Sequence, residues 1–153
     1  MPTKQLLIMT MLISILTIGP FHTEYHAAKT MNNCDQTTLE LTEQIANIET
    51  KEEIKTILGN DYKEVTGEMY NNVVWRFDIC PKTDYQNDTN IDSVDLEGLK
   101  SGQLKKVLFF SFSENQQTII NKSLYYSDNQ NNIHVVTFKG NQEQDEIIYK
   151  GTE

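Results

Sequence analysis

The stretch TKEEIKTILGNDYKEVTGEMYNNVVWRFDI, residues 50–79, decides the fold. It opens with Thr50 and Glu53, a capping box in which each side chain satisfies a free backbone amide at the start of a helix. Gly59 supplies the left-handed conformation that ends this helix. The apolar residues between these two signals recur at helical spacing: Ile54, Ile57 and Leu58. The segment therefore predicts a two-turn helix that packs through one face.

After this helix the sequence changes to the pattern of β-structure. Residues 62–66 can form a short strand, and Asn71 and Asn72 favour a tight turn because asparagine tolerates positive φ. From Val73 to Ile79 every second residue belongs to one apolar set, which is the period of a strand with one face in water. A helix followed by a hairpin is the predicted unit.

The flanking sequence extends this unit into an α+β fold. A second capping box, Thr37-x-x-Glu40, precedes apolar residues at helical spacing: Leu41, Ile45 and Ile48. Further strand patterns follow the hairpin, at 104–112, 117–126 and 133–138. Helices first and hairpin-linked strands afterwards predict two short N-terminal helices packed on one face of a four- or five-stranded antiparallel sheet.

Two stretches fall outside these elements. Residues 80–103 form a long acidic connection, and a loop of that length is usually functional or disordered. Residues 140–153 form an acidic tail, predicted to be disordered because only 147–149 are apolar enough to pack. The predicted binding domain therefore covers residues 37–139, after a flexible segment at 29–36.

The N-terminus has the features of a targeting segment. A basic start precedes the uncharged run 6–19, which is shorter than the roughly 20 residues of a bilayer-spanning helix. Small residues at Ala27 and Ala28 complete the pattern of a cleaved signal peptide over residues 1–28. An uncleaved membrane anchor is the alternative. Lipid attachment at Cys34 is disfavoured, because no small residue directly precedes it.

Net charge and cysteine content indicate an extracellular protein that does not bind anionic partners. The formal net charge of -9 argues against nucleic acid or an anionic membrane as the partner. Outside the cytosol Cys34 and Cys80 can pair, although two free thiols remain the alternative. One arginine against twelve lysines, with many Asn and Ile, is typical of low-GC Gram-positive bacteria.

Reactive side chains are too few to predict an enzyme. After residue 28 the only histidine is His134, inside a strand pattern that favours a solvent-facing role over a catalytic one. A hydrolase using Cys34 or His134 is the rival interpretation. We predict neither a cofactor nor a metal site: Asp88, Asp92 and Asp95 could contact calcium weakly, but the loop lacks the glycine and closing glutamate of an EF-hand.

The strand aromatics predict the binding surface. Apolar residues fall on both faces of the predicted sheet, and the helices can cover only one of them. The other face would show aromatic side chains to a protein partner, unless the 80–103 connection or the tail covers it. The predicted partner-binding residues combine these aromatics with the nearby acidic segment: Trp75, Phe110, Phe112, Tyr126, Asp92, Asp95 and Glu97.

Residues 50–79 also carry a family resemblance. The Thr-capped helix, the Leu-Gly stop and the strand VVWRFD resemble the SmpA/OmlA (BamE-like) domain, although Asn60-Asp61 replace its usual proline. The resemblance implies a small envelope domain that acts by protein contact, with an architecture similar to the β-lactamase inhibitory proteins. We therefore expect a secreted or cell-surface, non-enzymatic protein-binding module. The alternatives are a secreted enzyme inhibitor and an exclusion or immunity-type factor of a mobile element.

Overall fold

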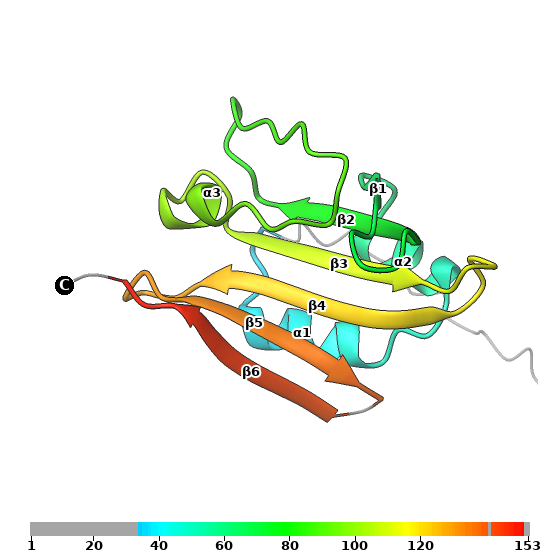
Figure 1. The fold of residues 1–153 in the computed structure, drawn as a ribbon. Helices are drawn as coiled ribbons and strands as arrows, with labels where there is room; N and C mark the ends of the chain where they lie inside the picture. Colours follow the sequence, from blue (N-terminus) through cyan, green and yellow to red (C-terminus); the bar gives the residue numbers. More distant parts are fainter. Residues whose placement is uncertain (1–33, 141, 152–153) are drawn as a thin grey trace, which may run out of the picture.

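The computed structural model of the chain describes residues 34–140 and 142–151. Two helices, α1 (Thr38–Ala46) and α2 (Lys51–Leu58), precede six strands, and a short helix, α3 (Leu96–Lys100), follows the second strand. The strands are β1 (Lys63–Thr66), β2 (Val73–Ile79), β3 (Lys106–Phe112), β4 (Ile119–Ser127), β5 (Ile133–Lys139) and β6 (Gln142–Tyr149). They form one antiparallel sheet in chain order, β1 to β6 (Figure 1). The predicted α+β class is confirmed, but the predicted strand number of four or five is wrong.

Both predicted capping boxes are present. The Thr37 hydroxyl accepts from the Glu40 amide and the Thr50 hydroxyl from the Glu53 amide, while each glutamate accepts from the cap residue's amide. Gly59 ends α2 with φ at 87°, a conformation that favours glycine. In the described parts of the chain, no helix is long and apolar enough to cross a membrane.

Helices α1 and α2 cover one face of the sheet, called here the helix face. Their apolar residues pack against alternate residues of β2 to β5, such as Phe77, Leu108 and Leu124. Lys122 on β4 ties the sheet to the end of α1, because its buried Nζ donates to the carbonyl oxygens of Ile45, Ala46 and Ile48. This face contains the core that the sequence predicts.

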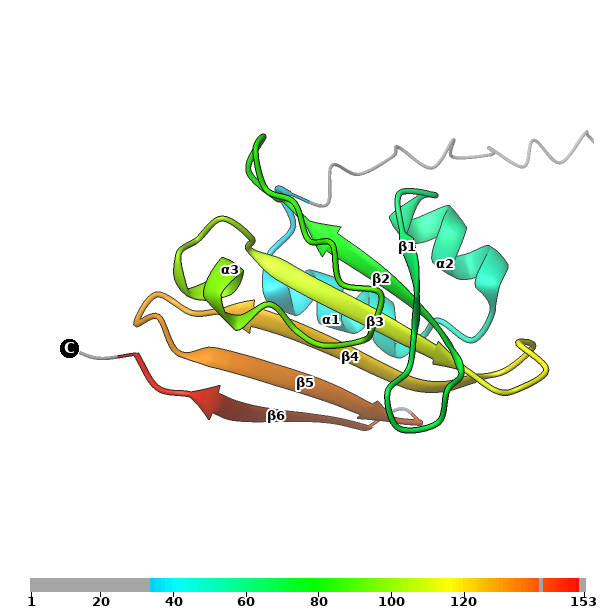
Figure 2. The ribbon, with the colours of Figure 1, turned by 45° about the horizontal axis from the view of Figure 1, so that its top comes forward.

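The connection of residues 80–105, which includes α3, covers part of the opposite face, called here the loop face. In Figure 2 it passes in front of β2 and β3, whereas α1 lies behind the sheet. It completes a second buried cluster: Val65, Val74, Leu99, Leu104, Val107, Phe109 and Ile133. The sequence predicts a face of β2 in water, but Val74 and Arg76 on that face are 0% and 1% exposed. The strand therefore has two covered faces.

The side chain of Arg76 on β2 holds this connection against the loop face through hydrogen bonds. Its Nε donates to Asp78 Oδ1 at 2.7 Å, and its terminal nitrogens donate to the Ser93 carbonyl at 3.3 Å and the Tyr85 hydroxyl at 3.2 Å. The Tyr85 hydroxyl in turn donates to Asp95 at 3.2 Å. Burial raises the pKa of Tyr85, so this phenol stays protonated. One buried guanidinium thus anchors several turns of an otherwise irregular segment.

Both ends of the domain lie outside the predicted limits of 37–139. Cys34 is bonded to Cys80 at the end of β2, so the predicted pairing is confirmed, and Lys106 Nζ donates to the Gln36 carbonyl at 2.8 Å. The prediction of a disordered tail is wrong, because residues 142–147 and Tyr149 pair with β5 as β6, with a register shift at Ile148. The predicted signal peptide and residues 29–33 lie outside the described residues.

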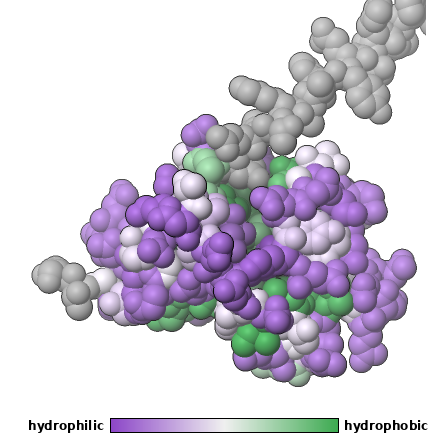
Figure 3. Space-filling view, turned by 90° about the horizontal axis from the view of Figure 1, so that it is seen from above, coloured by the Kyte–Doolittle hydropathy of each residue, from purple (hydrophilic) through white to green (hydrophobic). Residues whose placement is uncertain are grey.

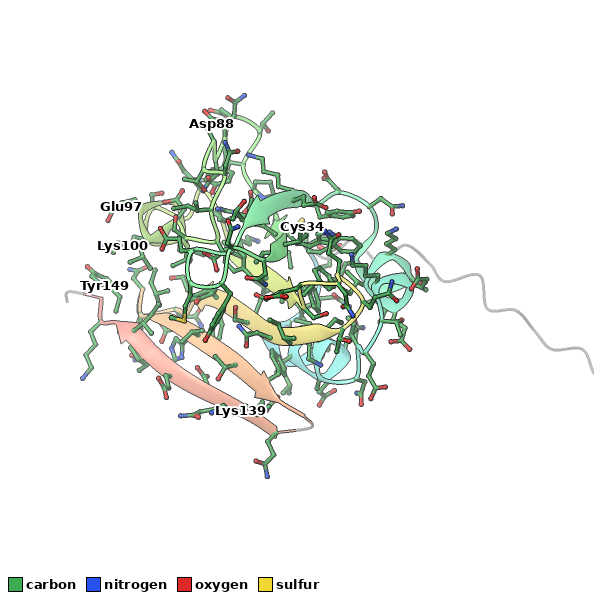
Figure 4. The ribbon with its side chains drawn as sticks, turned by 45° about the vertical axis from the view of Figure 1, so that its right-hand side comes forward. Cys34, Asp88, Glu97, Lys100, Lys139 and Tyr149 are labelled. Atoms are coloured by element: carbon green, nitrogen blue, oxygen red, sulfur yellow. A yellow bond between two sulfur atoms is a disulfide. The ribbon has the colours of Figure 1, made fainter. Side chains whose placement is uncertain are left out.

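The two edges of the sheet differ. The outer edge of β1 is covered by residues 90–92: the Thr66 amide donates to the Asn90 carbonyl at 2.8 Å, and the Asp92 amide to the Thr66 carbonyl at 3.1 Å. The Lys63 ammonium also bonds the Asn87 carbonyl. At the other edge, β6 is joined to the connection through Lys100, whose Nζ lies 4.1 Å from the centre of the Tyr149 ring (Figure 4).

Candidate interaction surface

The most exposed apolar side chains of the described residues lie together on the β1–β2 turn. Met69 and its neighbour Tyr70 are 79% and 72% exposed, more than any other large apolar side chain there. The turn projects from the loop face of the sheet (Figures 1 and 2). The surface seen from above in Figure 3 is otherwise mostly hydrophilic, with small separate hydrophobic patches. We call residues 68–71 the hairpin tip.

The hairpin tip stands on a closely bonded base. The Gly67 amide donates to the Asn72 carbonyl, and the Asn71 amide to the Gly67 carbonyl, both at 2.8 Å. Asn71 has a φ of 50°, as its place in the predicted turn suggests. A Cβ atom at Gly67 would lie 2.3 Å from Asn72 Oδ1, so a larger residue there would displace the buried Asn72 side chain. The backbone of the turn is therefore fixed before any partner binds.

Two contacts join this base to its surroundings. The buried Asn72 amide group donates to the Phe112 carbonyl at 2.8 Å, which ties the turn to the end of β3. On the other side, the Glu68 amide donates to Asp92 Oδ1 at 3.0 Å. Asp92, a predicted site residue, thus lies at the foot of the hairpin tip. Glu68 and Asp92 make this end of the surface acidic.

The prediction that Trp75, Phe110 and Phe112 form an exposed aromatic surface is wrong. Trp75, Phe110 and Phe112 are 3%, 0% and 0% exposed, because the strand register turns them toward α1 and α2. Trp75 is further covered by the Tyr62 ring, whose centre lies 4.1 Å away, and by the ammonium groups of Lys51 and Lys55. The alternation in β2 is read correctly from the sequence. The sequence does not correctly predict which of the two faces the helices cover.

The remaining predicted site residues are scattered. Asp95 caps α3 by accepting from the Gly98 amide at 2.8 Å, and the exposed Glu97 pairs with Lys100 at 2.8 Å. In Figure 4 the labelled Glu97 and Lys100 lie on the side of the sheet near Tyr149. Tyr126 is half-buried on the helix face, and its hydroxyl donates to Asp145 at 2.8 Å. The structure thus brings only Asp92 to the hairpin tip.

The residues of the rival hydrolase hypothesis do not meet. Cys34 is in a disulfide and holds no thiol. The His134 side chain is 15% exposed, less than a solvent-facing strand residue, and each ring nitrogen contacts a carboxylate: Asp145 at 3.0 Å and Asp128 at 3.2 Å. The Tyr126 ring stacks on it with centres 4.7 Å apart. Residues 34–140 and 142–151 contain no group of three or more His, Cys, Asp or Glu that could hold a metal ion.

A polar cleft of about 460 Å³ lies between the start of β1 and residues 81–88. Lys63, Arg76 and Asp78 line it. The Arg76 guanidinium there already bonds Asp78, Ser93 and Tyr85, so its charge is directed at the protein rather than at a ligand. The cleft is therefore a weaker candidate than the hairpin tip.

Comparison of the chain with family models, curated proteins and solved structures finds no match. The resemblance of residues 50–79 to the SmpA/OmlA domain accordingly stays a prediction. The function is inferred from the surface alone. The hairpin tip was not predicted from the sequence. The signal that could have found it is an apolar pair, Met69-Tyr70, inside a turn marked by Gly67 and Asn71.

Proposed function

We propose that this protein is an extracellular, non-enzymatic protein-binding module of a bacterial envelope that contacts its partner through the hairpin tip. The observation that carries the proposal is the exposure of Met69 and Tyr70, at 79% and 72%, on a turn with a fixed backbone. Exposure of apolar side chains to water is unfavourable, and their burial against a partner lowers the free energy.

The chemistry of the two side chains supports this role. Tyrosine is enriched in the residues that dominate binding energy, and methionine adapts to irregular apolar surfaces. Because the hydrogen bonds at Gly67 and Asn72 fix the turn in advance, binding orders little backbone. Glu68 and Asp92 beside the apolar pair favour a partner whose contact surface has a basic rim. The net charge of -9 also attracts a basic partner at long range.

The Cys34–Cys80 disulfide supports an oxidising compartment, since such bonds are rare in the bacterial cytosol. It agrees with the signal-peptide pattern of residues 1–28. A secreted inhibitor of an enzyme is the second candidate. A projecting turn favours it, because a turn can enter a concave active site that a flat sheet face cannot reach.

Site-specific photocrosslinking tests the proposal. A photoreactive phenylalanine analogue replaces Tyr70 in one variant of the full chain and Lys139 in the other, and both are made in the cells that produce the protein. Lys139 is an exposed control on β5. We expect a discrete adduct from position 70 and none from position 139. Equal adducts from both positions, or an adduct from position 139 alone, would contradict the proposal.

Once the adduct identifies the partner, Tyr70→Ala measures the contribution of the hairpin tip. We expect affinity to fall by at least about 30-fold, the size of a binding hot spot of about 2 kcal/mol. The free energy of unfolding should change by less than about 0.5 kcal/mol, as for an exposed side chain. Unchanged affinity with unchanged stability would place the contact elsewhere.

A further inference from the structure

Strand β6 is an edge strand with little side-chain support. From Gln142 to Ile148 all its side chains are exposed, and Ile147 and Ile148 remain 48% and 45% exposed. Within the described part of β6, only Asp145 hydrogen-bonds through its side chain to another strand. Beyond its backbone pairing with β5, this strand is held at its end by Tyr149, which packs on the loop-face cluster and against Lys100, and along its exposed part by the contacts of Asp145.

Those contacts converge on His134 of β5. Its Nδ1 lies 3.0 Å from Asp145 Oδ1, and its Nε2 lies 3.2 Å from Asp128 Oδ2. A carboxylate only accepts hydrogen bonds, so both ring nitrogens must donate at once. Only the doubly protonated, positively charged imidazolium can do so. The geometry therefore fits the imidazolium form of the ring.

The two carboxylates differ in freedom. Asp128 is fixed inside the β4–β5 turn, where it accepts at 2.8 Å from the amides of Gln130 and Asn132 and from the Asn132 side chain. Asp145 belongs to the edge strand. A neutral ring keeps one N–H, which can bond only one of the two carboxylates. Asp145 has fewer other bonds than Asp128, a single one from the Tyr126 hydroxyl at 2.8 Å, and it lies on the edge strand, so it is the carboxylate that we expect to lose its contact with the ring.

We propose that β6 is a proton-controlled edge strand, which the His134 imidazolium holds against β5 through Asp145 and which loosens when His134 loses its proton. The titratable groups that face the ring are Asp145 from β6, Asp128 from the β4–β5 turn and Tyr126 from β4. Loosening β6 uncovers the backbone edge of β5, which then offers unpaired amides and carbonyls.

The charges around the ring set the pH range. Burial lowers the pKa of His134, but the hydrogen bonds to Asp128 and Asp145 and their charges outweigh it, so the pKa is raised above 6.5. A raised pKa gives a stabilisation that is complete below about 6.5, the value of the unfolded chain, and is lost as pH rises through the folded pKa.

The neighbouring groups stay constant in that range. The Asn132 side chain is the main cause that lowers the pKa of Asp128 to about 2, so this carboxylate is charged throughout. Burial and the hydrogen bond to Asp145 raise the pKa of Tyr126 to about 12, so its hydroxyl continues to donate. A change in β6 between pH 5 and 9 therefore reports on His134.

Hydrogen exchange of the full chain between pH 5 and 9 tests the proposal, with rates corrected for intrinsic exchange and the amides of β3 as the internal reference. The variants are His134→Gln, which does not titrate, and Lys139→Gln, an exposed control on the same strand. The NMR resonance of the His134 ring is assigned by its absence in His134→Gln. Its pH titration is then measured in the wild-type protein, so the resulting pKa does not depend on the stability of a variant.

We expect His134 to titrate above 6.5, and the protection of β6 relative to β3 to fall as pH rises through that pKa. Lys139→Gln should behave like the wild type, and His134→Gln should show no such fall. Three results would each overturn the proposal: titration at or below 6.5, an equal fall in β3, or an unchanged fall in His134→Gln.

Discussion

The two faces of this sheet are buried by different means. On the helix face, α1 and α2 carry their own start signals, and their apolar residues meet the alternate residues of the strands. On the loop face, an irregular connection with one helix of five residues is held by the side chain of Arg76. Two regular helices bury the helix face, whereas a polar network around the Arg76 guanidinium helps to bury the loop face. Because both faces of the central strands are covered, the most exposed large apolar side chains of the described residues lie on the hairpin tip and not on the sheet.

The largest effects should come from a matched pair of phenylalanines. Phe110 faces the helices and Phe109 faces the connection, and they are 0% and 3% exposed. Each substitution, Phe110→Ala and Phe109→Ala, should lower the free energy of unfolding by about 3–5 kcal/mol, as for buried aromatics. Urea denaturation of the oxidised protein gives both values. A loss below about 1 kcal/mol for Phe109→Ala alone would mean that the loop face is open, and would end the comparison.

A smaller and more local effect should follow from Arg76→Met. This change removes the charge-assisted hydrogen bonds to Asp78, Ser93 and Tyr85 and the guanidinium over the Phe109 ring, but keeps an unbranched apolar side chain at this buried position. We expect a loss of about 2 kcal/mol, because Asp78 is partly exposed and can be solvated again. Hydrogen exchange should accelerate in residues 85–95 while α1 and α2 keep their protection. Acceleration in the helices of the same size would show that Arg76 supports the whole core rather than one face.

The same contrast explains how much of the fold the sequence predicts. Capping residues, helical spacing and strand alternation are local signals, and they placed α1, α2 and β1 to β5 correctly. The coverage of the loop face depends on contacts such as Arg76 with Ser93, which are distant in sequence and leave no periodic pattern. Strand β6 was missed because its residues from 142 to 148 are all exposed and so lack the alternation of a half-buried strand.

The candidate site was predictable only in part. The sequence correctly indicated a turn at Asn71, and the predicted site residue Asp92 lies at the foot of that turn, where it accepts from the Glu68 amide. It could not decide which set of alternate residues in β2 and β3 the helices cover, since both sets contain apolar side chains. Trp75, Phe110 and Phe112 were consequently expected on the wrong side. A shift of strand register by one residue exchanges the two faces, and only tertiary packing fixes it.

Hydroxyl-radical footprinting of the intact, oxidised protein tests the central claim most directly. It measures the oxidation rate of each side chain, here normalised to the rate in the unfolded chain, and so reports which apolar residues meet water. The account predicts that Met69 and Tyr70 oxidise at nearly their unfolded rates, whereas Trp75, Phe110 and Phe112 are strongly protected. Rapid oxidation of Trp75 together with protection of Tyr70 would contradict it, and would return the contact surface to the face of the sheet.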